Sequence, residues 1–236
     1  MIKLVAFDLD GTLTQHKTKL DAKNKRVLER LAEKYTLVMA GAGLCIRIFN
    51  QMDQFPIDII GSYGMQIGLY NEKEKTIDIV KNVTMPVNKE EIENKVTFLR
   101  KKYGYTDFKG DNVQYHSSGA ITFPVLGTDA EQADKLAFDP DRTKRRKIYN
   151  EVCELFSNYN VFVGGSSSFD MAPKPYNKYT ALSEYCESKG IKHNEVVFVG
   201  DDYGLGGNDE KVYKSDFGFI CVDDYTKLED YVKELL

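Results

Sequence analysis

Cysteine and histidine are scarce in this chain, and their spacing excludes two kinds of structural site. The 236 residues include four cysteines and three histidines. The cysteines are scattered and form no Cys-x-x-Cys pair, so we interpret them as reduced apolar residues of a cytoplasmic protein rather than as a disulfide framework. The histidines, at positions 16, 116 and 193, lack the spacing of a zinc site.

Long apolar runs and a strong net charge are also missing. We find no signal peptide and no run long enough to cross a bilayer. The net charge of -4 gives no general attraction for nucleic acid or anionic membranes. The basic run at 142–147 falls on an amphipathic pattern, which favours a solvated helix face. We therefore expect a cytoplasmic protein that binds neither nucleic acid nor membranes.

Strand-like and helical patterns alternate at both ends of the chain. Fully apolar strands that alternate with helices predict a doubly wound, Rossmann-like α/β fold, in which a parallel sheet is covered on both faces. A hairpin is also expected over 65–80. The strand-like runs are at 2–7, 35–41, 57–62, 195–200 and 217–222, and helices are expected from about Asp21, over 44–52, over 178–188 and over 225–236.

The middle of the chain has a different pattern. A capping box at Asn88 predicts a helix to about Lys102, and a second helix is expected over 141–156. Strand-like runs at 113–118 and 120–126 and a hairpin over 160–173 complete an α+β unit. We therefore predict a core formed by 1–84 and 175–236 and an inserted α+β cap domain at 85–174. Two short linkers predict a hinged cap that closes over a site.

Two aspartates follow the first apolar run, in the motif Asp8-Leu9-Asp10-Gly11-Thr12. Side chains at i and i+2 of a strand share a face, so both carboxylates could reach one pocket. Close carboxylates repel each other and raise one pKa unless a cation binds. The pair suits a divalent metal, with one carboxylate as nucleophile and the other transferring protons. The alternative is a capping aspartate and a turn aspartate around Gly11.

A second acidic motif begins at Gly200-Asp201-Asp202 and continues with Gly206-Gly207-Asn208-Asp209. Its glycines permit unusual dihedral angles and a close approach of the backbone to a ligand. Mg²⁺ binds through one or two carboxylates and substrate phosphate oxygens, and Asp8 with Asp201 would meet that need. The alternative is a loop that ends in a helix N-cap at Asn208 or Asp209.

Three distant segments should meet at one end of the predicted sheet. Asp8, Gly41 and Asp201 each follow a strand, and ligands of such sheets bind at the carboxyl ends of the strands. Lys178 opens a predicted helix and could offset the charge of a nucleophile and a phosphate. The alternative for Lys178 is a solvated surface lysine, since lysines are rarely buried without a partner.

These motifs together resemble the haloacid dehalogenase superfamily of phosphotransferases, with a type IIB cap. Within it they are most similar to the eukaryotic-type phosphomannomutase family. The first motif is FDLDGTLT, the passage GGSSSFDMAPKPYNK at 164–178 is similar in spacing and most identities, and GDDYGLGGND at 200–209 is similar to the fourth motif. The resemblance spans nearly the whole chain.

The resemblance implies a role for each matching residue. Asp8 would be the nucleophile that forms a phosphoaspartate, Asp10 the general acid and base, and Lys178 the cation that stabilises the transferring group. It implies Mg²⁺ as the cofactor and a possible homodimer through the cap. The metal ligands would be Asp8, the Asp10 backbone carbonyl and Asp201, supported by Asp202, Asn208 and Asp209, and the substrate contacts would include Lys17, the backbone at Gly41, Ala42 and Gly43, and the cap residues Ser168 and Asp170.

Three departures from the family pattern affect the reaction. Ala40 or Ala42, depending on alignment, stands where a Ser or Thr hydroxyl is expected, and a lost transition-state donor can cost ~10²–10³ in rate. Ser117 and Thr128 stand where the mutase cap has arginines. Lys17 replaces a core arginine and lacks its bidentate fork.

Without strong clamps for a second phosphate, water should intercept the phosphoaspartate more easily. We therefore expect a phosphatase that hydrolyses a phosphorylated sugar or a similar metabolite. A sugar phosphate mutase that interconverts 1- and 6-phosphates is the first alternative, and a catalytically weakened phosphosugar-binding protein is the second. Four cap cations could replace the missing arginines: Lys135, Arg142, Lys144 and Arg145.

Overall fold

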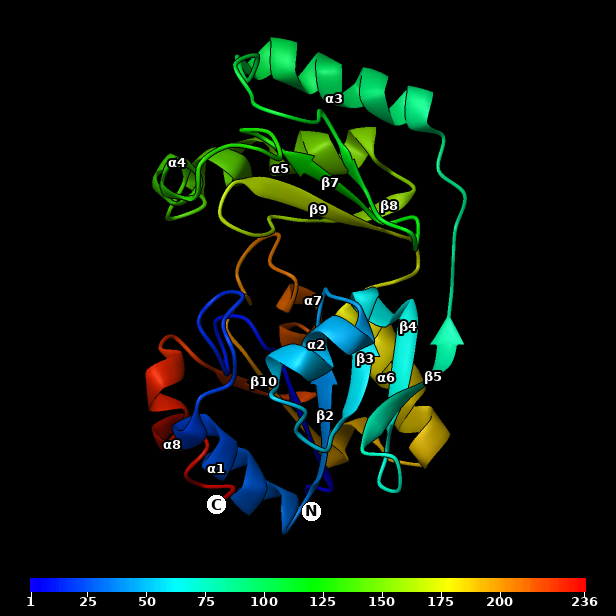
Figure 1. The fold of residues 1–236 in the computed structure, drawn as a ribbon, viewed down its shortest axis with the longest axis vertical. Helices are drawn as coiled ribbons and strands as arrows, with labels where there is room; N and C mark the ends of the chain where they lie inside the picture. The colour runs from blue at the N-terminus through cyan, green and yellow to red at the C-terminus, as the bar shows by residue number, and fades with distance from the viewer. The chain divides into compact units, whose positions relative to one another are not determined.

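The first part of the structure is built on a seven-stranded, mostly parallel sheet (Figure 1). The computed structural model describes Met1–Leu236. The strand order is β11-β10-β1-β2-β3-β4-β5, in which the pairs from β11 to β3 are parallel and β4 and β5 are antiparallel. The strands are β1 (Leu4–Phe7), β2 (Thr36–Ala40), β3 (Asp58–Gly61), β4 (Gln66–Asn71), β5 (Thr76–Asn82), β10 (Val196–Gly200) and β11 (Gly218–Cys221).

Apolar packing on both faces of this sheet explains why its inner strands are apolar throughout. Val5 and Phe7 of β1 lie in one core with residues of α1 and α2, whereas Leu4 and Ala6 lie in a second core with residues of α6. Successive strand residues point to opposite faces, so each needs an apolar partner. The doubly wound α/β fold is confirmed. The helices are α1 (Ala22–Ala32), α2 (Cys45–Gln51), α6 (Lys178–Lys189), α7 (Glu210–Tyr213) and α8 (Leu228–Tyr231), with 3₁₀ turns η1 (Ser62–Gly64), η2 (His193–Glu195) and η3 (Tyr225–Lys227).

Side-chain caps fix where two of these helices begin. The Asp21 carboxylate accepts a hydrogen bond from the Asn24 amide at 2.8 Å, and α1 begins at Ala22, directly after Asp21. The Asn177 side chain accepts one from the Thr180 amide at 3.1 Å, so α6 begins at Lys178. Such caps satisfy amides that have no partner within the helix.

The carboxyl-terminal segment differs from the prediction of one helix over 225–236. The structure has η3 followed by the four-residue α8. The Asp224 carboxylate accepts hydrogen bonds from the Thr226 amide at 3.0 Å and from its hydroxyl at 2.6 Å. This local turn competes with a regular helix, while Leu228 and Val232 still reach the core with no exposed surface. The predicted length of the terminal helix was wrong.

The middle of the chain forms a four-stranded antiparallel sheet in the order β6-β7-β9-β8. Its own apolar core contains Phe123, Val152 and Phe169. The strands are β6 (Gln114–Tyr115), β7 (Ile121–Pro124), β8 (Tyr159–Phe162) and β9 (Ser168–Pro173), and the helices are α3 (Lys89–Tyr103), α4 (Gln132–Phe138) and α5 (Thr143–Leu155). The short α4 buries no residue, so it has no clear periodic pattern by which to predict it.

The chain divides into two compact units. The first contains 1–83, 176–204 and 209–236, and the second contains 84–175 together with 205–208. The placement of 205–208 in the second unit differs from the sequence-based division, which left this segment with the core. It separates Asp201 from Asp209 along the chain.

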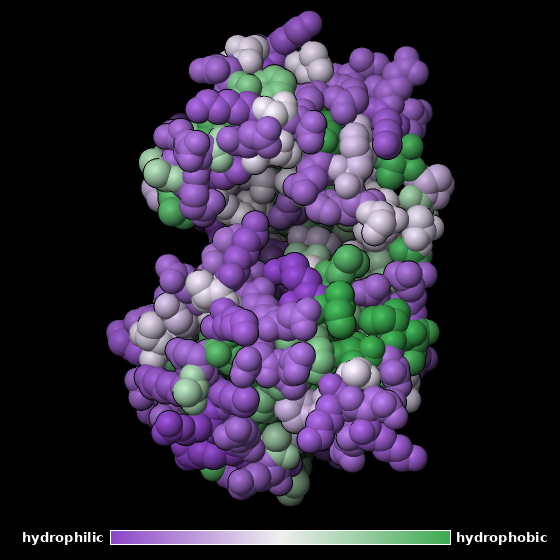
Figure 2. Space-filling view, viewed as in Figure 1, coloured by the Kyte–Doolittle hydropathy of each residue, from purple (hydrophilic) through white to green (hydrophobic).

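The surface of the first unit carries some apolar side chains. Figure 2 shows them gathered on the face of that unit where α2 and β4 lie. Exposed apolar residues of these parts of the chain include Leu44 and Ile46, and the edge strand β5 exposes Ile79. None of the helices is long and apolar enough to cross a membrane.

Candidate active site

The three strands at the centre of the first sheet end next to one another. β10, β1 and β2 are neighbours and run parallel, so their carboxyl ends share one edge. Asp201 follows β10, Asp8 follows β1 and Gly41 follows β2. The structure thus brings these three distant positions to one edge of the sheet.

Lys178 lies between two carboxylates at this edge. Its ammonium donates to Asp8 Oδ1 at 2.5 Å and to Asp209 Oδ1 at 2.7 Å. The exposed fraction is 1% for Lys178, 5% for Asp8 and 0% for Asp209. A solvated surface lysine is therefore excluded. Charges buried this deeply need partners, and each of these three groups has one.

Asp209 precedes α7, but its side chain does not cap that helix. Its Oδ1 accepts from Lys178, and its Oδ2 accepts from the Asp202 amide at 3.1 Å. A Cβ on Gly200 would lie 2.5 Å from Asp209 Oδ2. The carboxylate is therefore turned toward Lys178 and the end of β10 rather than toward its own helix.

Asp201 is held against the turn of the first motif. Its Oδ1 accepts a hydrogen bond from the Thr12 hydroxyl at 3.0 Å. Gly11, at φ +99°, leaves room for this carboxylate, because a Cβ there would lie 2.4 Å from Asp201 Oδ2. The glycine of the DxDGT motif thus serves both the turn and the approach of the distant aspartate.

Burial raises the pKa values of the three clustered carboxyl groups. The pKa rises from 3.8 to about 7 for Asp8, to about 7 for Asp209 and to about 6 for Asp201, with repulsion from other carboxylates adding to the effect. Burial alone would lower the pKa of Lys178, but the charges of Asp209 and Asp8 outweigh burial and raise it above its usual value. The ammonium of Lys178 therefore does not fully neutralise the negative charge of the three carboxylates.

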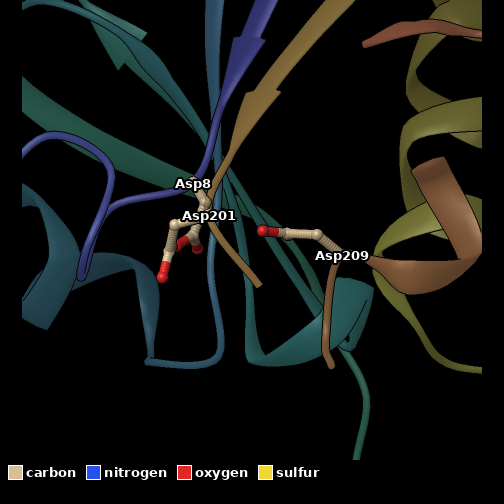
Figure 3. A group of neighbouring side chains, drawn as sticks. All are labelled: Asp8, Asp201 and Asp209. Atoms are coloured by element: carbon tan, nitrogen blue, oxygen red, sulfur yellow. The ribbon is translucent and has the colours of Figure 1, made fainter. Parts of the chain in front are cut away.

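The donor set of this cluster fits a hard divalent cation. One oxygen each from Asp8, Asp201 and Asp209 lies within 4.8 Å of the others (Figure 3). Carboxylate oxygens are the ligands that Mg²⁺ prefers, and raised carboxyl pKa values show that further positive charge would be stabilised there. These three side chains can therefore hold a metal ion.

The Asp10 side chain is held by other partners. Its Oδ1 accepts from the Lys17 amide at 2.7 Å and from Gln51 Nε2 at 2.6 Å. The side-chain oxygen Oε1 of Gln51 in turn accepts from Arg47 Nη1 at 2.9 Å, and Asp10 Oδ2 lies 3.9 Å from His16 Nδ1. The Asp10 side chain is thus held in a fixed orientation by α2 and by the Lys17 amide.

The two alanines near the end of β2 differ in their exposure to solvent. Ala40 is completely buried in the apolar core of the sheet, whereas Ala42 is exposed. Gly43 lies against Arg47, because a Cβ on Gly43 would lie 2.1 Å from Arg47 Nη2. Of the two alanines, Ala42 is therefore the one that faces out of the turn beside the site.

In the second unit, the predicted contact residues Ser168 and Asp170 lie on β9. The Ser168 hydroxyl donates to the Gly164 carbonyl at 3.1 Å. Asp170 Oδ1 accepts from the Thr122 hydroxyl at 2.8 Å, and His116 Nε2 lies 3.0 Å from that hydroxyl oxygen. Asp170, Thr122 and His116 are thus linked through their side chains, whereas the Ser168 side chain is bound to the backbone.

Arg145, one of the four cap cations, is buried with no exposed surface. Its Nε donates to Asp139 Oδ2 at 2.8 Å. Its Nη1 donates to the carbonyls of Gly164 at 2.6 Å, Ser168 at 2.9 Å and Gly165 at 3.3 Å. Arg145 therefore organises the backbone of the second unit.

A hollow of about 600 Å³ in the second unit lies apart from all predicted site residues. It is lined by Glu93, Phe108 and the segment 110–115. Glu93 accepts from the Tyr115 hydroxyl at 3.0 Å and from Asn112 Nδ2 at 2.6 Å. These partners orient the carboxylate within the lining.

The sequence did not predict two residues that position side chains of the site, Thr12 and Gln51, and it gave Asp209 too small a part. Thr12 lies within the first motif, but its contact with Asp201 joins residues 189 positions apart. Gln51 has no motif to mark it, because helix packing alone brings it to Asp10. Asp209 was predicted as a supporting residue, and the structure places it in the central cluster beside Lys178.

Cys45, which follows the turn after β2, is a buried thiol, and burial raises its pKa to about 11.

Comparison with known proteins decides the family. The model of the haloacid dehalogenase-like hydrolases matches residues 5–209. The chain belongs to this family. It is similar to phosphomannomutases: it is 24% identical to the phosphomannomutase of Triticum aestivum over 221 residues, which cover 90% of the chain and 86% of that protein.

Solved structures of haloacid dehalogenase proteins share its fold. A subclass IIB sugar phosphatase aligns with a TM-score of 0.64 at 16% identity, over 99% of this chain and all 100% of the other. An IMP-bound IMP-nucleotidase mutant of Plasmodium falciparum aligns with a TM-score of 0.69 at 14% identity, over 99% of this chain and 68% of the other. At such identities the likeness is one of fold.

Proposed function

We propose that this protein is a Mg²⁺-dependent phosphatase that hydrolyses a phosphorylated sugar or a similar metabolite through a phosphoaspartate at Asp8. The observation that carries the proposal is the buried group of Asp8, Lys178 and Asp209 at the end of the central strands. An ammonium held this close to the nucleophile can stabilise the charge of a transferring phosphoryl group.

Each of the two aspartates of the first motif has a chemical task in this proposal. Asp8 attacks phosphorus and releases the sugar hydroxyl, which takes a proton from Asp10. Asp10 then accepts a proton from the water that cleaves the phosphoaspartate. The hydrogen bonds from the Lys17 amide and Gln51 support a fixed orientation of Asp10 throughout.

The metal would be held at the aspartate cluster. Asp8 and Asp201 are proposed as ligands together with the backbone carbonyl of Asp10, and Asp209 adds negative charge beside them. Mg²⁺ bound there would neutralise the charge of the nucleophile and the phosphate. The Thr12 hydrogen bond supports this role, because it orients one Asp201 oxygen.

The contacts of Arg145 favour hydrolysis over phosphate exchange between two positions of a sugar. A mutase must retain a bisphosphate, which requires a strong cationic clamp on the phosphate that is not reacting. Among the four candidate cap cations, Arg145 is buried and bound to Asp139 and to backbone carbonyls. Together with Ser117 and Thr128 at the arginine positions, this supports a phosphatase.

A sugar phosphate mutase is the second candidate function. The phosphomannomutase of Triticum aestivum matches 90% of this chain. Lys135 donates a single hydrogen bond to the Thr128 carbonyl at 2.8 Å, and this contact could be exchanged for a phosphate. The mutase hypothesis therefore requires that cations other than Arg145 bind the second phosphate.

The product distinguishes the two candidates. The protein is incubated with Mg²⁺ and mannose 1-phosphate, glucose 1-phosphate or other sugar phosphates, with and without an activating sugar bisphosphate. We expect inorganic phosphate as the main product. A 6-phosphate isomer formed without phosphate release would overturn the phosphatase proposal in favour of a mutase.

Substitution of the nucleophile tests the mechanism common to both. We expect Asp8→Asn to abolish turnover, because a neutral amide cannot form the phosphoaspartate, and Asp10→Asn to slow turnover while leaving metal binding largely intact. Steady-state phosphate release and calorimetric Mg²⁺ titration measure the two effects. Undiminished turnover of Asp8→Asn would contradict the mechanism.

A further inference from the structure

The turn at the end of β3, residues 61–64, has an unusual backbone. Ser62, Tyr63 and Gly64 have φ angles of +48°, +57° and +92°, so three successive residues are left-handed. Glycine adopts this conformation without a steric cost, whereas a residue with a side chain is strained in it. Ser62 and Tyr63 are nearly completely buried. Such strain persists only where the surrounding structure imposes it, and it is frequent beside functional sites.

The 61–64 turn binds the segment that follows β2. The Ser62 amide donates to the Gly43 carbonyl at 2.7 Å, and the Tyr63 amide donates to the Gly41 carbonyl at 3.3 Å. Gly61 also lies close to this segment, because a Cβ there would lie 2.8 Å from the Gly43 carbonyl oxygen. The segment after β2 is therefore held through two of its carbonyl groups.

These contacts leave amides of the same segment available to a ligand. The Gly41 amide donates to the Ile60 carbonyl at 2.9 Å, whereas the amides of Ala42 and Gly43 donate to no acceptor within the protein. Ala42 is exposed and Gly43 is partly exposed. Amides that are held in place without an acceptor are suited to bind phosphate oxygens, because they need no reorganisation when charge develops.

On its other side, the 61–64 turn contacts the helix that carries Lys178. A Cβ on Gly64 would lie 2.3 Å from Ala181 Cβ and 3.3 Å from Ala181 Cα. Residues three apart are neighbours on a helix, so Ala181 lies on the same face of α6 as Lys178. Further along α6, the Tyr185 hydroxyl donates to Asp58 Oδ2 at 2.7 Å and fixes the helix to the start of β3. A side chain at position 64 would therefore displace the end of α6 that positions the ammonium.

We propose that the 61–64 turn positions groups of the phosphoryl site on two sides: the two amides after β2 that lack an acceptor, and the ammonium of Lys178. Gly61 and Gly64 are its positioning residues, since neither position has room for a methyl group. The inference rests on the proposed function only in taking these amides and Lys178 as groups that bind a phosphoryl group. It gives a segment that carries no reacting side chain a part in the reaction.

Gly64→Ala tests the contact with α6, because its methyl group collides with Ala181. Gly190→Ala is the matched control: Gly190 follows the same helix with a φ of +66°, and a Cβ there would meet nothing within 4 Å. Both variants carry a left-handed alanine, but only Gly64→Ala crowds α6 near Lys178. Adding Ala181→Gly to Gly64→Ala removes the collision and leaves the left-handed alanine in place.

We expect Gly64→Ala to lower kcat about 10–100-fold with little change in KM, because a small displacement of a group that acts in the transition state can cost about 10²-fold. Gly190→Ala should keep the wild-type kcat, and the double variant should recover most of the loss. Phosphate release from a saturating sugar phosphate with Mg²⁺ gives kcat, and urea unfolding gives the stability of each variant. Wild-type kcat in Gly64→Ala, or no recovery in the double variant, would overturn the role of Gly64.

Gly61→Ala tests the contact with the segment after β2. It adds no left-handed strain, since the φ of Gly61 is −101°, but its methyl group would press on the Gly43 carbonyl oxygen. We expect inorganic phosphate, titrated by calorimetry with Mg²⁺ present, to bind roughly five- to tenfold more weakly, as the loss of one hydrogen bond predicts. Gly190→Ala should bind phosphate as the wild type does. Wild-type phosphate affinity in Gly61→Ala would contradict the role of Gly61.

The two proposals fail in different ways. If the protein released no phosphate from any substrate, the proposed function would fail, but phosphate titration of Gly61→Ala would still test the turn. Amide hydrogen exchange in the first turn of α6 would do the same for Gly64→Ala, where we expect faster exchange than in Gly190→Ala. If the turn had no positioning role, both variants would match Gly190→Ala in these measurements while the wild type continued to release phosphate.

Discussion

A single ammonium group organises the candidate active site. Lys178 contacts both Asp8 and Asp209, which are buried and whose pKa values are raised. At the scale of the residue, the site therefore combines a cation that lowers the cost of charge on Asp8 with burial that raises that cost. The balance leaves room for a second cation, which would complete the charge compensation.

Ala42, the exposed alanine of the turn after β2, offers a gain-of-function test. We expect Ala42→Ser to raise kcat up to roughly tenfold, because a hydroxyl at this position would supply a donor to the phosphate where donors can be worth ~10²–10³. Ala40→Ser is the matched control. Ala40 has no exposed surface, so its hydroxyl should cost about 1–3 kcal/mol of stability and bring no gain in kcat.

Steady-state kinetics and urea unfolding measure the two alanine variants. A rise in kcat for Ala40→Ser but not for Ala42→Ser would contradict the assignment of Ala42 to the hydroxyl position. Unchanged kcat in Ala42→Ser would mean that the backbone amides of this turn already bind the phosphate as well as the hydroxyl could.

At the scale of the element, α5 connects the segment that precedes it to the β8–β9 turn through Arg145. Its guanidinium joins Asp139, which precedes the helix, to the carbonyls of the β8–β9 turn. The pKa of Asp139 is lowered because the hydrogen bonds from Arg145 and from two amides outweigh the effect of burial. The helix thus fixes the turn that leads into β9 and its residues Ser168 and Asp170.

Removal of this guanidinium should unfold or loosen the second unit. We expect Arg145→Met to cost about 3–5 kcal/mol of stability, because it leaves Asp139 buried without its charged partner. Urea unfolding and hydrogen exchange across β8 and β9 provide the measurement, with Lys147→Met on the exposed side of the helix as the control. A loss of activity with unchanged stability would instead indicate that Arg145 contacts substrate, as a mutase clamp would.

At the scale of the whole molecule, stability should depend on pH through the carboxylate cluster. Folding raises the pKa of Asp8 and Asp209 from 3.8 to about 7, so the folded chain keeps protons that the unfolded chain loses at lower pH. This contribution is complete below about pH 4 and is lost as the pH rises toward 7.

We therefore expect the metal-free protein to lose stability between about pH 4 and pH 7, by at most roughly 1.4 kcal/mol per pH unit for each such group. Urea unfolding across this range measures it, and Asp8→Asn should give a shallower slope because one titrating group is removed. Saturating Mg²⁺ should stabilise most above pH 7, by about 2.7 kcal/mol at a hundred times its Kd. A metal-free stability that rises equally in both proteins would contradict the burial of these protons.

The sequence alone predicted the parallel sheet and the ends of its strands. Fully apolar runs such as Val196–Gly200 had to be covered on both faces, and parallel strand ends had to share an edge. This local physics also predicted that Asp8, Gly41 and Asp201 would each follow a strand and meet at one end of the sheet. The four-residue α7 and the exposed α4 were not predicted, because short or unburied helices leave little periodic signal.

The partners of the site side chains depended on tertiary packing. Periodicity does not reveal that Asp209 turns away from its own helix toward Lys178, or that Gln51 on α2 orients Asp10. It also does not reveal whether Ala40 or Ala42 is the buried alanine, since that depends on where β2 ends. These contacts join residues far apart in the chain, so no local pattern contains them.

The sequence by itself determined the fold and the residue types of the candidate site, because strand patterning and residue types act locally. It placed aspartates at the ends of particular strands and a lysine at the start of a helix. Only the tertiary structure decided how these groups compensate one another's charge, and that Arg145 holds the backbone of the second unit. Those outcomes depend on burial and on distances between remote segments, which exist only once the chain is packed.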